Sequence, residues 1–376
     1  MGRYWRRSLS AAALLLGLAL TVSLAAAGVL KWARLGFLQG APGRQPAVAA
    51  LAAHPTDPDV LYAGTWLTTP GAALVYRSED GGQNWRAAAD GLPTDLPATS
   101  GVVDLLIDPA NPRTLYLALH RRGVWRSDDG GQSWHNIGEG VVAEDEDVVA
   151  LALSGGDLYV LSAEGLNVLS GDGRWKAMNR GLPTRNVVYN DFAFDPTDEG
   201  TLYMVTSPDG LYRTTNGGRN WRAANNDLPG TTGNIKGITI DEAGRIFLTI
   251  RGVGLVRSDD AGRTWTPSGE GITYTNTLVG TVSAPVFDPA DADVAYVHNS
   301  DGIFRSVDGG ATWQPFNDGL SVTAVVMDIS FAPARPHVAL AGTAASGAWA
   351  ASEHDPDPPD PPDPTPRLLF MPMIRR

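Results

Sequence analysis

The sequence predicts an all-β fold, a seven-bladed β-propeller of four-stranded antiparallel blades, on three observations. An octet with the pattern Ser-x-Asp-x-Gly-x-(Thr/Ser/Asn)-Trp recurs along the chain. Each octet lies in a unit of about 40 to 50 residues with four short strand-like runs, which is typical of a propeller blade. The high content of glycine (43 residues) and proline (27 residues) agrees with many turns.

The unit at residues 102–140 shows this order of elements most clearly. Residues 103–107 and 114–118 read as two apolar strands, and the turn at 108–112 between them holds two prolines that block strand continuation. Residues 124–127 form a third strand, and the octet that follows leads into a fourth at 134–137. We therefore expect every octet to be the hairpin between the third and fourth strands of a blade.

Six units are complete, and they begin near residues 47, 102, 148, 190, 236 and 285. A seventh begins at Val326 and supplies three strands before its octet breaks off after Ser352. Trp32 precedes Trp85 by 53 residues, which is close to the repeat spacing. We predict that the N-terminal strand around Trp32 completes blade seven, because a closed ring leaves no exposed strand edge.

The residue types of the octet suit a tight hairpin. Its glycines allow positive φ, its carboxylate and hydroxyl can accept backbone N–H bonds, and its tryptophan can anchor the hairpin on the blade. Asn216 replaces the aspartate in one copy, so a negative charge is not required there. We assign a structural role to Ser78, Asp80, Trp85, Ser127, Asp129, Trp134, Asp172, Trp175, Thr214, Asn216, Trp221, Ser258, Asp260, Trp265, Ser306, Asp308 and Trp313.

The octets resemble the Asp-box (BNR) repeat of sialidases, sortilin ectodomains, two-propeller xyloglucanases and the propeller-type assembly factors of photosystem II. The resemblance covers residues 30–352. It implies a propeller fold, and in the enzymes of this group the active site lies at the ring centre, on the face opposite the octets. The length and single-propeller build most resemble the photosystem-assembly type.

Three further segments flank the predicted propeller. Residues 1–29 hold three arginines before an apolar run, which predicts a signal peptide cleaved after Ala27 or a retained signal anchor that tethers the chain to a membrane. Residues 353–366 form an Asp/Pro-rich linker, and residues 367–376 form a short apolar and basic tail. We therefore expect an extracytoplasmic protein, either secreted or anchored by its N-terminal segment.

Composition excludes several classes of function. The chain has no cysteine, which excludes disulfides and thiol chemistry. The formal net charge is −12, which disfavours binding to nucleic acid. We recognise no nucleophile elbow, zincin helix, phosphate loop or calcium-loop spacing, so we expect neither a cofactor nor a metal, and we expect a monomer.

The candidate ligand-binding residues are those expected on the face opposite the octets, in the loops between strands two and three and in the links between blades. They are Trp66, His120, Arg121, Arg122, Arg185, Tyr189, Arg251, Tyr274 and His298, with Asp191, Lys236 and Asp301 beside them. Arginines and aromatic rings around a funnel suit a protein or glycan ligand. We favour a non-catalytic binding scaffold, and the alternative is a sialidase-like glycoside hydrolase.

Overall fold

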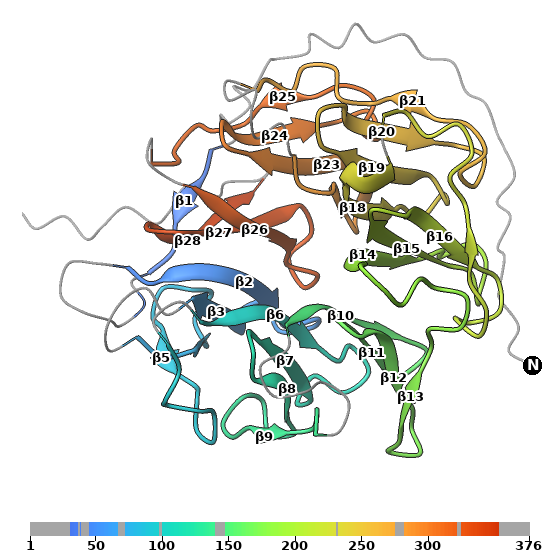
Figure 1. Cartoon of the computed structure of the whole chain (residues 1–376). Coiled ribbons are helices and arrows are strands. Elements are labelled where there is room, and N and C mark those ends of the chain that lie inside the picture. The colour runs from blue at the N-terminus through green and yellow to red at the C-terminus, as the bar shows by residue number, and fades with distance from the viewer. Residues whose placement is uncertain are drawn as a thin grey trace, which may run out of the picture.

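The computed structural model confirms a seven-bladed β-propeller, with seven four-stranded antiparallel sheets arranged in a ring (Figure 1). The structure describes residues 31–36, 38, 45–66, 72–97, 100–139, 147–230, 232–274, 282–321 and 325–352. The predicted signal segment, the Asp/Pro-rich linker and the C-terminal tail lie outside the described residues. Within these ranges, the structure contains no helix that is long and apolar enough to cross a membrane.

The first four blades follow one another along the chain, each with its strands in sequence order. Blade 1 contains β2 (Ala47–Ala53), β3 (Leu61–Trp66), β4 (Val75–Ser78) and β5 (Arg86–Ala87). Blade 2 contains β6 (Val102–Ile107), β7 (Leu115–Leu119), β8 (Gly123–Ser127) and β9 (His135–Asn136). Blade 3 contains β10 (Val148–Ser154), β11 (Asp157–Ser162), β12 (Gly165–Leu169) and β13 (Trp175–Ala177). Blade 4 contains β14 (Val188–Phe194), β15 (Leu202–Ser207), β16 (Gly210–Thr214) and β17 (Arg222–Ala223).

The last three blades include one short first strand and one blade built from both ends of the propeller. A 3₁₀ turn, η1 (Thr232–Asn234), leads into blade 5, which contains β18 (Ile235–Ile240), β19 (Ile246–Ile250), β20 (Gly254–Ser258) and β21 (Thr266–Pro267). Blade 6 contains β22 (Val286–Asp288), β23 (Asp291–Asn299), β24 (Gly302–Ser306) and β25 (Gln314–Pro315). Blade 7 contains β26 (Val326–Phe331), β27 (Val338–Thr343), β28 (Gly347–Ser352) and β1 (Ala33–Arg34).

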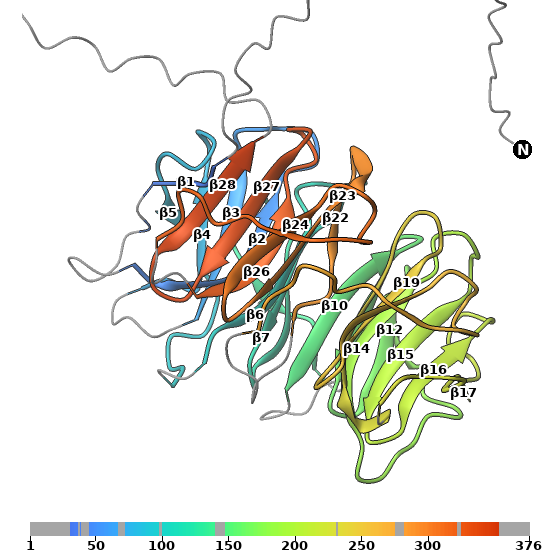
Figure 2. The same ribbon diagram turned by 90° about the horizontal axis from the view of Figure 1, so that it is seen from above.

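The strand β1 completes blade 7, as the truncated seventh unit predicts. It pairs antiparallel with β28, with Ala33 opposite Ala350 and Arg34 opposite Trp349, and Figure 2 shows the two strands side by side. Trp32 is 2% exposed. Its backbone N–H donates to the carbonyl of Asp318 and its indole N–H to the carbonyl of Phe316, at 2.7 and 2.9 Å. The two ends of the propeller are therefore joined within one sheet.

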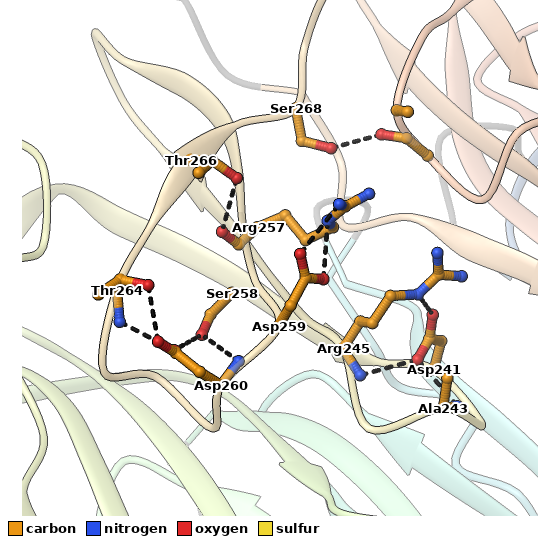
Figure 3. Close-up of polar contacts among 12 residues, drawn as sticks. Asp241, Ala243, Arg245, Arg257, Ser258, Asp259, Asp260, Thr264, Thr266 and Ser268 are labelled. Atoms are coloured by element: carbon orange, nitrogen blue, oxygen red, sulfur yellow. Dashed lines mark hydrogen bonds and ion pairs between the residues drawn. The ribbon is translucent and has the colours of Figure 1, made fainter.

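The four full octets that carry an aspartate share one set of hydrogen bonds, part of which Figure 3 shows for blade 5. The Ser258 hydroxyl donates to Asp260 and accepts the N–H of Gly262, both at 2.8 Å. The other carboxylate oxygen of Asp260 accepts the Thr264 hydroxyl at 2.7 Å. These bonds, with the Thr264 hydroxyl the largest contributor, lower the pKa of Asp260 to about 2. The octet aspartate is thus an ionised acceptor inside its own hairpin.

The octet tryptophans do more than anchor their own hairpins, because most of them bond to the preceding blade. The indole N–H of Trp134 donates to the carbonyl of Ala88 at 2.9 Å, across the junction of blades 1 and 2. Trp175, Trp221 and Trp313 make the equivalent bonds to the carbonyls of Ile137, Met178 and Ser268. The Trp32 bond to Phe316 has the same form, so the indole links neighbouring blades around most of the ring.

The link between blades needs a glycine where it crosses the next tryptophan. A Cβ on Gly319 would lie 2.1 Å from the carbonyl oxygen of Trp32, and Gly319 has a φ of +86°. Asp227 occupies the matching position between blades 4 and 5, with a φ of +49°. At this junction the indole nitrogen of Trp265 is buried without a hydrogen-bond partner among the described residues. The junction of blades 4 and 5 therefore lacks an indole bond to the preceding blade, and so does the junction of blades 7 and 1, where the Trp85 indole donates to Gly82 of its own hairpin.

Candidate functional site

The chain topology defines two faces of the ring. The octets join strands three and four and the Asp-Pro turns join strands one and two, so both lie on one face, called the octet face below. Loops that join strands two and three lie on the opposite, non-octet face. Trp66 ends β3 and His120 directly follows β7, so both predicted residues lie on the non-octet face.

The structure brings Trp66 and His120 together at the junction of blades 1 and 2. Trp66 is half-buried and forms an isolated β-bridge with Gly101, which places it beside the start of blade 2. Its ring centroid lies 5.2 Å from that of His120, with an angle of 50° between the rings. The Nε2 atom of His120 lies 3.1 Å from a carboxylate oxygen of Asp147, while its buried Nδ1 atom has no hydrogen-bond partner in the described part of the chain.

Two arginines border this aromatic pair. Arg121 has a φ of +56°, and its side chain is 60% exposed with Nε 3.6 Å from Asp147. Arg122 lies 3.9 Å from the carboxylate of Asp95. Because the Arg121 ion pair is long and largely exposed, it holds that guanidinium group weakly. The cluster Trp66, His120, Arg121 and Arg122, called the blade 2 cluster below, presents two aromatic rings and two cations.

The remaining predicted residues lie on blades 3 to 6, apart from the blade 2 cluster. Arg185, Lys236 and Arg251 are exposed. The Tyr274 side chain is half-buried, and its buried hydroxyl has no hydrogen-bond partner in the described ranges. Asp301 accepts a hydrogen bond from the Thr273 hydroxyl at 3.3 Å. The predicted set is therefore spread around the face, with one compact group on blades 1 and 2.

Two predicted residues, Tyr189 and His298, are shielded from solvent to different degrees: Tyr189 is buried, and His298 is half-buried. Tyr189 is 3% exposed and packs in the core between blades 3 and 4, where its hydroxyl donates to the carbonyl of Pro183. Burial lowers the pKa of His298 to about 4, so its imidazole is neutral at physiological pH. Tyr189 does not line an open surface, because its ring fills a core position.

Three carboxyls near the ring axis form a set that sequence reasoning identified only in part. Asp104, Asp191 and Asp328 occupy the same position in three first strands, directly after a β-bulge. Each accepts the backbone N–H of the next blade's first strand, from Leu151, Ile238 and Leu51, at 2.8 to 2.9 Å. Asp191 was a predicted candidate, whereas the other two were missed. The sequence feature that could have identified Asp104 and Asp328 is an aspartate within an otherwise apolar strand.

The environment of these carboxyls favours their protonated forms. Burial raises the pKa of Asp104 to about 6 and the pKa values of Asp191 and Asp328 to about 7. The negative charge of Asp104 contributes to the raised pKa of both Asp191 and Asp328. Each one therefore links two blades and is also a titratable group near neutral pH.

Exposed apolar side chains also gather on the non-octet face. The described residues include five large, exposed apolar side chains, and four of them lie on this face. Val188 and Met327 lie near the starts of first strands, Val325 immediately precedes one, and Val253 lies in a loop between strands two and three. These side chains belong to blades 4, 5 and 7, so they are separate exposed positions around the face rather than one patch.

Comparisons with known proteins show the fold. No family model and no curated protein sequence matches this chain. A structure of YCF48 bound to a D1 peptide is similar with a TM-score of 0.62 and 15% identity, covering 87% of this chain and 96% of that one. YCF48 from Cyanidioschyzon merolae has a TM-score of 0.58 and 17% identity, and the match covers 86% of this chain and 98% of that one. A GH74 xyloglucanase from Xanthomonas campestris has a TM-score of 0.61 and 20% identity over 85% of this chain, which spans 53% of the enzyme.

Proposed function

We propose that this protein is an extracytoplasmic, non-catalytic scaffold that binds a segment of another protein on its non-octet face. The observation that carries the proposal is the blade 2 cluster, where the Trp66 and His120 rings adjoin the exposed guanidinium of Arg121. Tryptophan, tyrosine and arginine are the side chains that contribute most to protein interfaces. A glycan that stacks on Trp66 is the other ligand class expected for such a surface.

Two further observations support a protein ligand. The exposed apolar residues Val188, Val253 and Val325 lie on the same face and would extend the contact beyond the cluster. One solved structure with the same fold is a complex of YCF48 with a D1 peptide. Identity to that protein is only 15%, so the likeness supports only that this fold can bind a peptide. The residues of this chain itself determine which ligand it binds.

A display selection with random peptides tests the proposal. The full chain is immobilised, and selected peptides are measured against three variants. We expect Trp66→Ala and Arg121→Ala each to weaken binding at least about tenfold, since interface anchors typically contribute 1 to 2 kcal/mol or more. Arg263→Ala is the matched control, because Arg263 is an exposed arginine of the blade 5 octet. Selected peptides whose binding is insensitive to both cluster variants would contradict the proposal.

Export is a separate part of the proposal and has its own test. Residues 1–29 carry the basic and apolar pattern of an export signal. A fusion of this segment to alkaline phosphatase, which is active only after export, should be active. Replacing Leu14, Leu15 and Leu16 with aspartate should abolish that activity. Equal activity of the two fusions would refute an export signal in this segment.

A glycoside hydrolase is the second candidate, and the raised pKa values of the axial carboxyls favour it. Each of these carboxyls accepts a backbone N–H from the next blade, which equally supports a structural role. A panel of chromogenic glycosides distinguishes the two readings. Hydrolysis by the wild-type chain that is lost in Asp191→Asn, in a variant that remains folded, would establish the enzyme and overturn the scaffold.

A further inference from the structure

A second site, on the octet face, lies between blades 5 and 6. A cavity of about 530 Å³ is bordered by the end of β18 with the turn that follows it, and by residues 285–292 of blade 6. The first strand of blade 6, β22, has only three residues, whereas the other six first strands have six or seven.

The cavity has an apolar wall and an acidic wall. Ile240, Val286 and Phe287 line it together with prolines and alanines, and its charged lining residues are Asp241, Glu242 and Asp288. No lysine, arginine or histidine is among the lining residues. Its volume falls in the range of small-ligand sites, roughly 300–1,000 Å³. The lining therefore suits a ligand with an apolar body and a positive charge.

Two of these carboxylates are unusual in this protein. As whole residues, Asp241 and Asp288 are only 4% and 3% exposed, whereas the axial aspartates Asp104, Asp191 and Asp328 are half-buried. Asp241 accepts the N–H groups of Ala243 and Arg245 and pairs with the Arg245 guanidinium (Figure 3). Asp288 accepts the N–H of Ala290 and lies 2.9 Å from Nδ1 of His337 on blade 7. These contacts fix both carboxylates at the cavity wall.

The third carboxylate differs because Glu242 is exposed at the rim of the cavity. The Phe287 ring is half-buried and stands against Phe247, with ring centroids 5.2 Å apart. A guanidinium group between these two residues could bond to the carboxylate through two N–H groups and also lie over the aromatic ring. Its aliphatic stem would then contact the apolar wall.

We propose that this cavity receives an arginine side chain of a partner protein, with Glu242 as its carboxylate and Phe287 as its aromatic contact. The proposal does not depend on the function of the non-octet face. The net charge of −12 favours a cationic partner at long range, and binding should weaken as ionic strength rises. Arginine suits the site better than lysine, because its planar fork matches both a carboxylate and a ring face.

N-acetylarginine methylamide is the probe, and N-acetylcitrulline methylamide is its uncharged counterpart of nearly the same shape. Ligand-observed NMR on the full chain should show the arginine probe binding at least about tenfold more tightly than the citrulline probe, the difference expected when a charged hydrogen bond is lost. A crystal soaked with the arginine probe should show its guanidinium between Glu242 and Phe287. Equal affinities for the two probes would refute the proposal.

Two variants complete the test. Glu242→Gln removes an exposed charge, so the chain should fold normally and bind the arginine probe about tenfold less tightly. Glu199→Gln is the matched control, because Glu199 is exposed on the corresponding turn of blade 4. Unchanged binding in Glu242→Gln would overturn the site, because Glu242 would then not bind the probe. An equal loss in Glu199→Gln would also overturn it, because the probe would then respond to the general negative charge of the face.

Discussion

At the scale of single residues, the chain uses aspartate in two opposite environments. Hydrogen bonds from Thr264 and Ser258 stabilise the ionised form of Asp260 in its octet. Burial near the ring axis disfavours the ionised form of Asp191, although that carboxylate accepts the N–H groups of Phe192 and Ile238. Compared with an aspartate in the unfolded chain, an octet aspartate therefore binds a proton less readily, and an axial aspartate binds one more readily.

The axial carboxyls predict a loss of stability as pH rises. The unfolded pKa of an aspartate is about 4, and the folded pKa of Asp191 is about 7. Between these values the folded state binds more protons than the unfolded state, so the free energy of unfolding falls as pH rises from about 4 to about 7. Asp191→Asn cannot titrate, and urea denaturation at several pH values should show a shallower decline in this variant.

The octet supplies a control of opposite sign. The folded pKa of Asp260 is about 2, so its contribution is present above about pH 4 and is lost as pH falls toward 2. Asp260→Asn should flatten the stability profile only in that acidic range and leave the range from 4 to 7 unchanged. If Asp191→Asn has the wild-type slope between pH 4 and 7, the axial carboxyl is not the group that titrates there.

At the scale of structural elements, the link between two blades depends on a close approach of two backbones. Gly319 passes the carbonyl of Trp32 at a distance that leaves no room for a side chain. Gly319→Ala should therefore lower the free energy of unfolding by at least about 1–2 kcal/mol, the cost of a left-handed conformation for a residue with a Cβ, with the clash added to it. Chemical denaturation measures this loss.

Gly171→Ala is the matched control for that prediction. A Cβ on Gly171 would meet no atom within 4 Å, and its φ is not in the left-handed region. This variant should be neutral or slightly stabilising, because alanine has less conformational freedom in the unfolded chain. Equal stabilities of the two variants would show that the link tolerates a side chain at Gly319.

Local patterns predicted the blades and the octets, because their signals lie within a few residues of one another. The role of Trp134 across the blade junction could not be predicted, since nothing near it in sequence indicates that its indole reaches Ala88. The sequence predicted which face of the ring holds the candidate site, but it did not predict which of the candidate residues contact one another. Trp66 and His120 do meet, whereas Tyr189 belongs to the core, because alternation along a strand does not say which aromatic ring fills the space between blades.

At the scale of the whole molecule, ring closure depends on a strand that is far in sequence from its neighbours. The indole bond of Trp32 spans 284 residues, and β1 covers the outer edge of β28. Without β1, blade 7 would expose the unpaired backbone of β28 as an edge strand, which promotes association between chains. The N-terminal strand thus closes the ring, and we expect it also to limit self-association of the propeller.

Trp32→Ala tests this closure. Loss of a buried tryptophan typically costs about 3–5 kcal/mol, and here it should also release β1. We expect faster hydrogen exchange in β28 and concentration-dependent self-association by light scattering. Trp175→Ala is the control, because Trp175 donates the equivalent bond to Ile137 in a blade whose four strands are consecutive in sequence. That variant should lose stability without faster exchange in β28. If both variants associate equally, the association comes from general destabilisation and not from the loss of closure by β1.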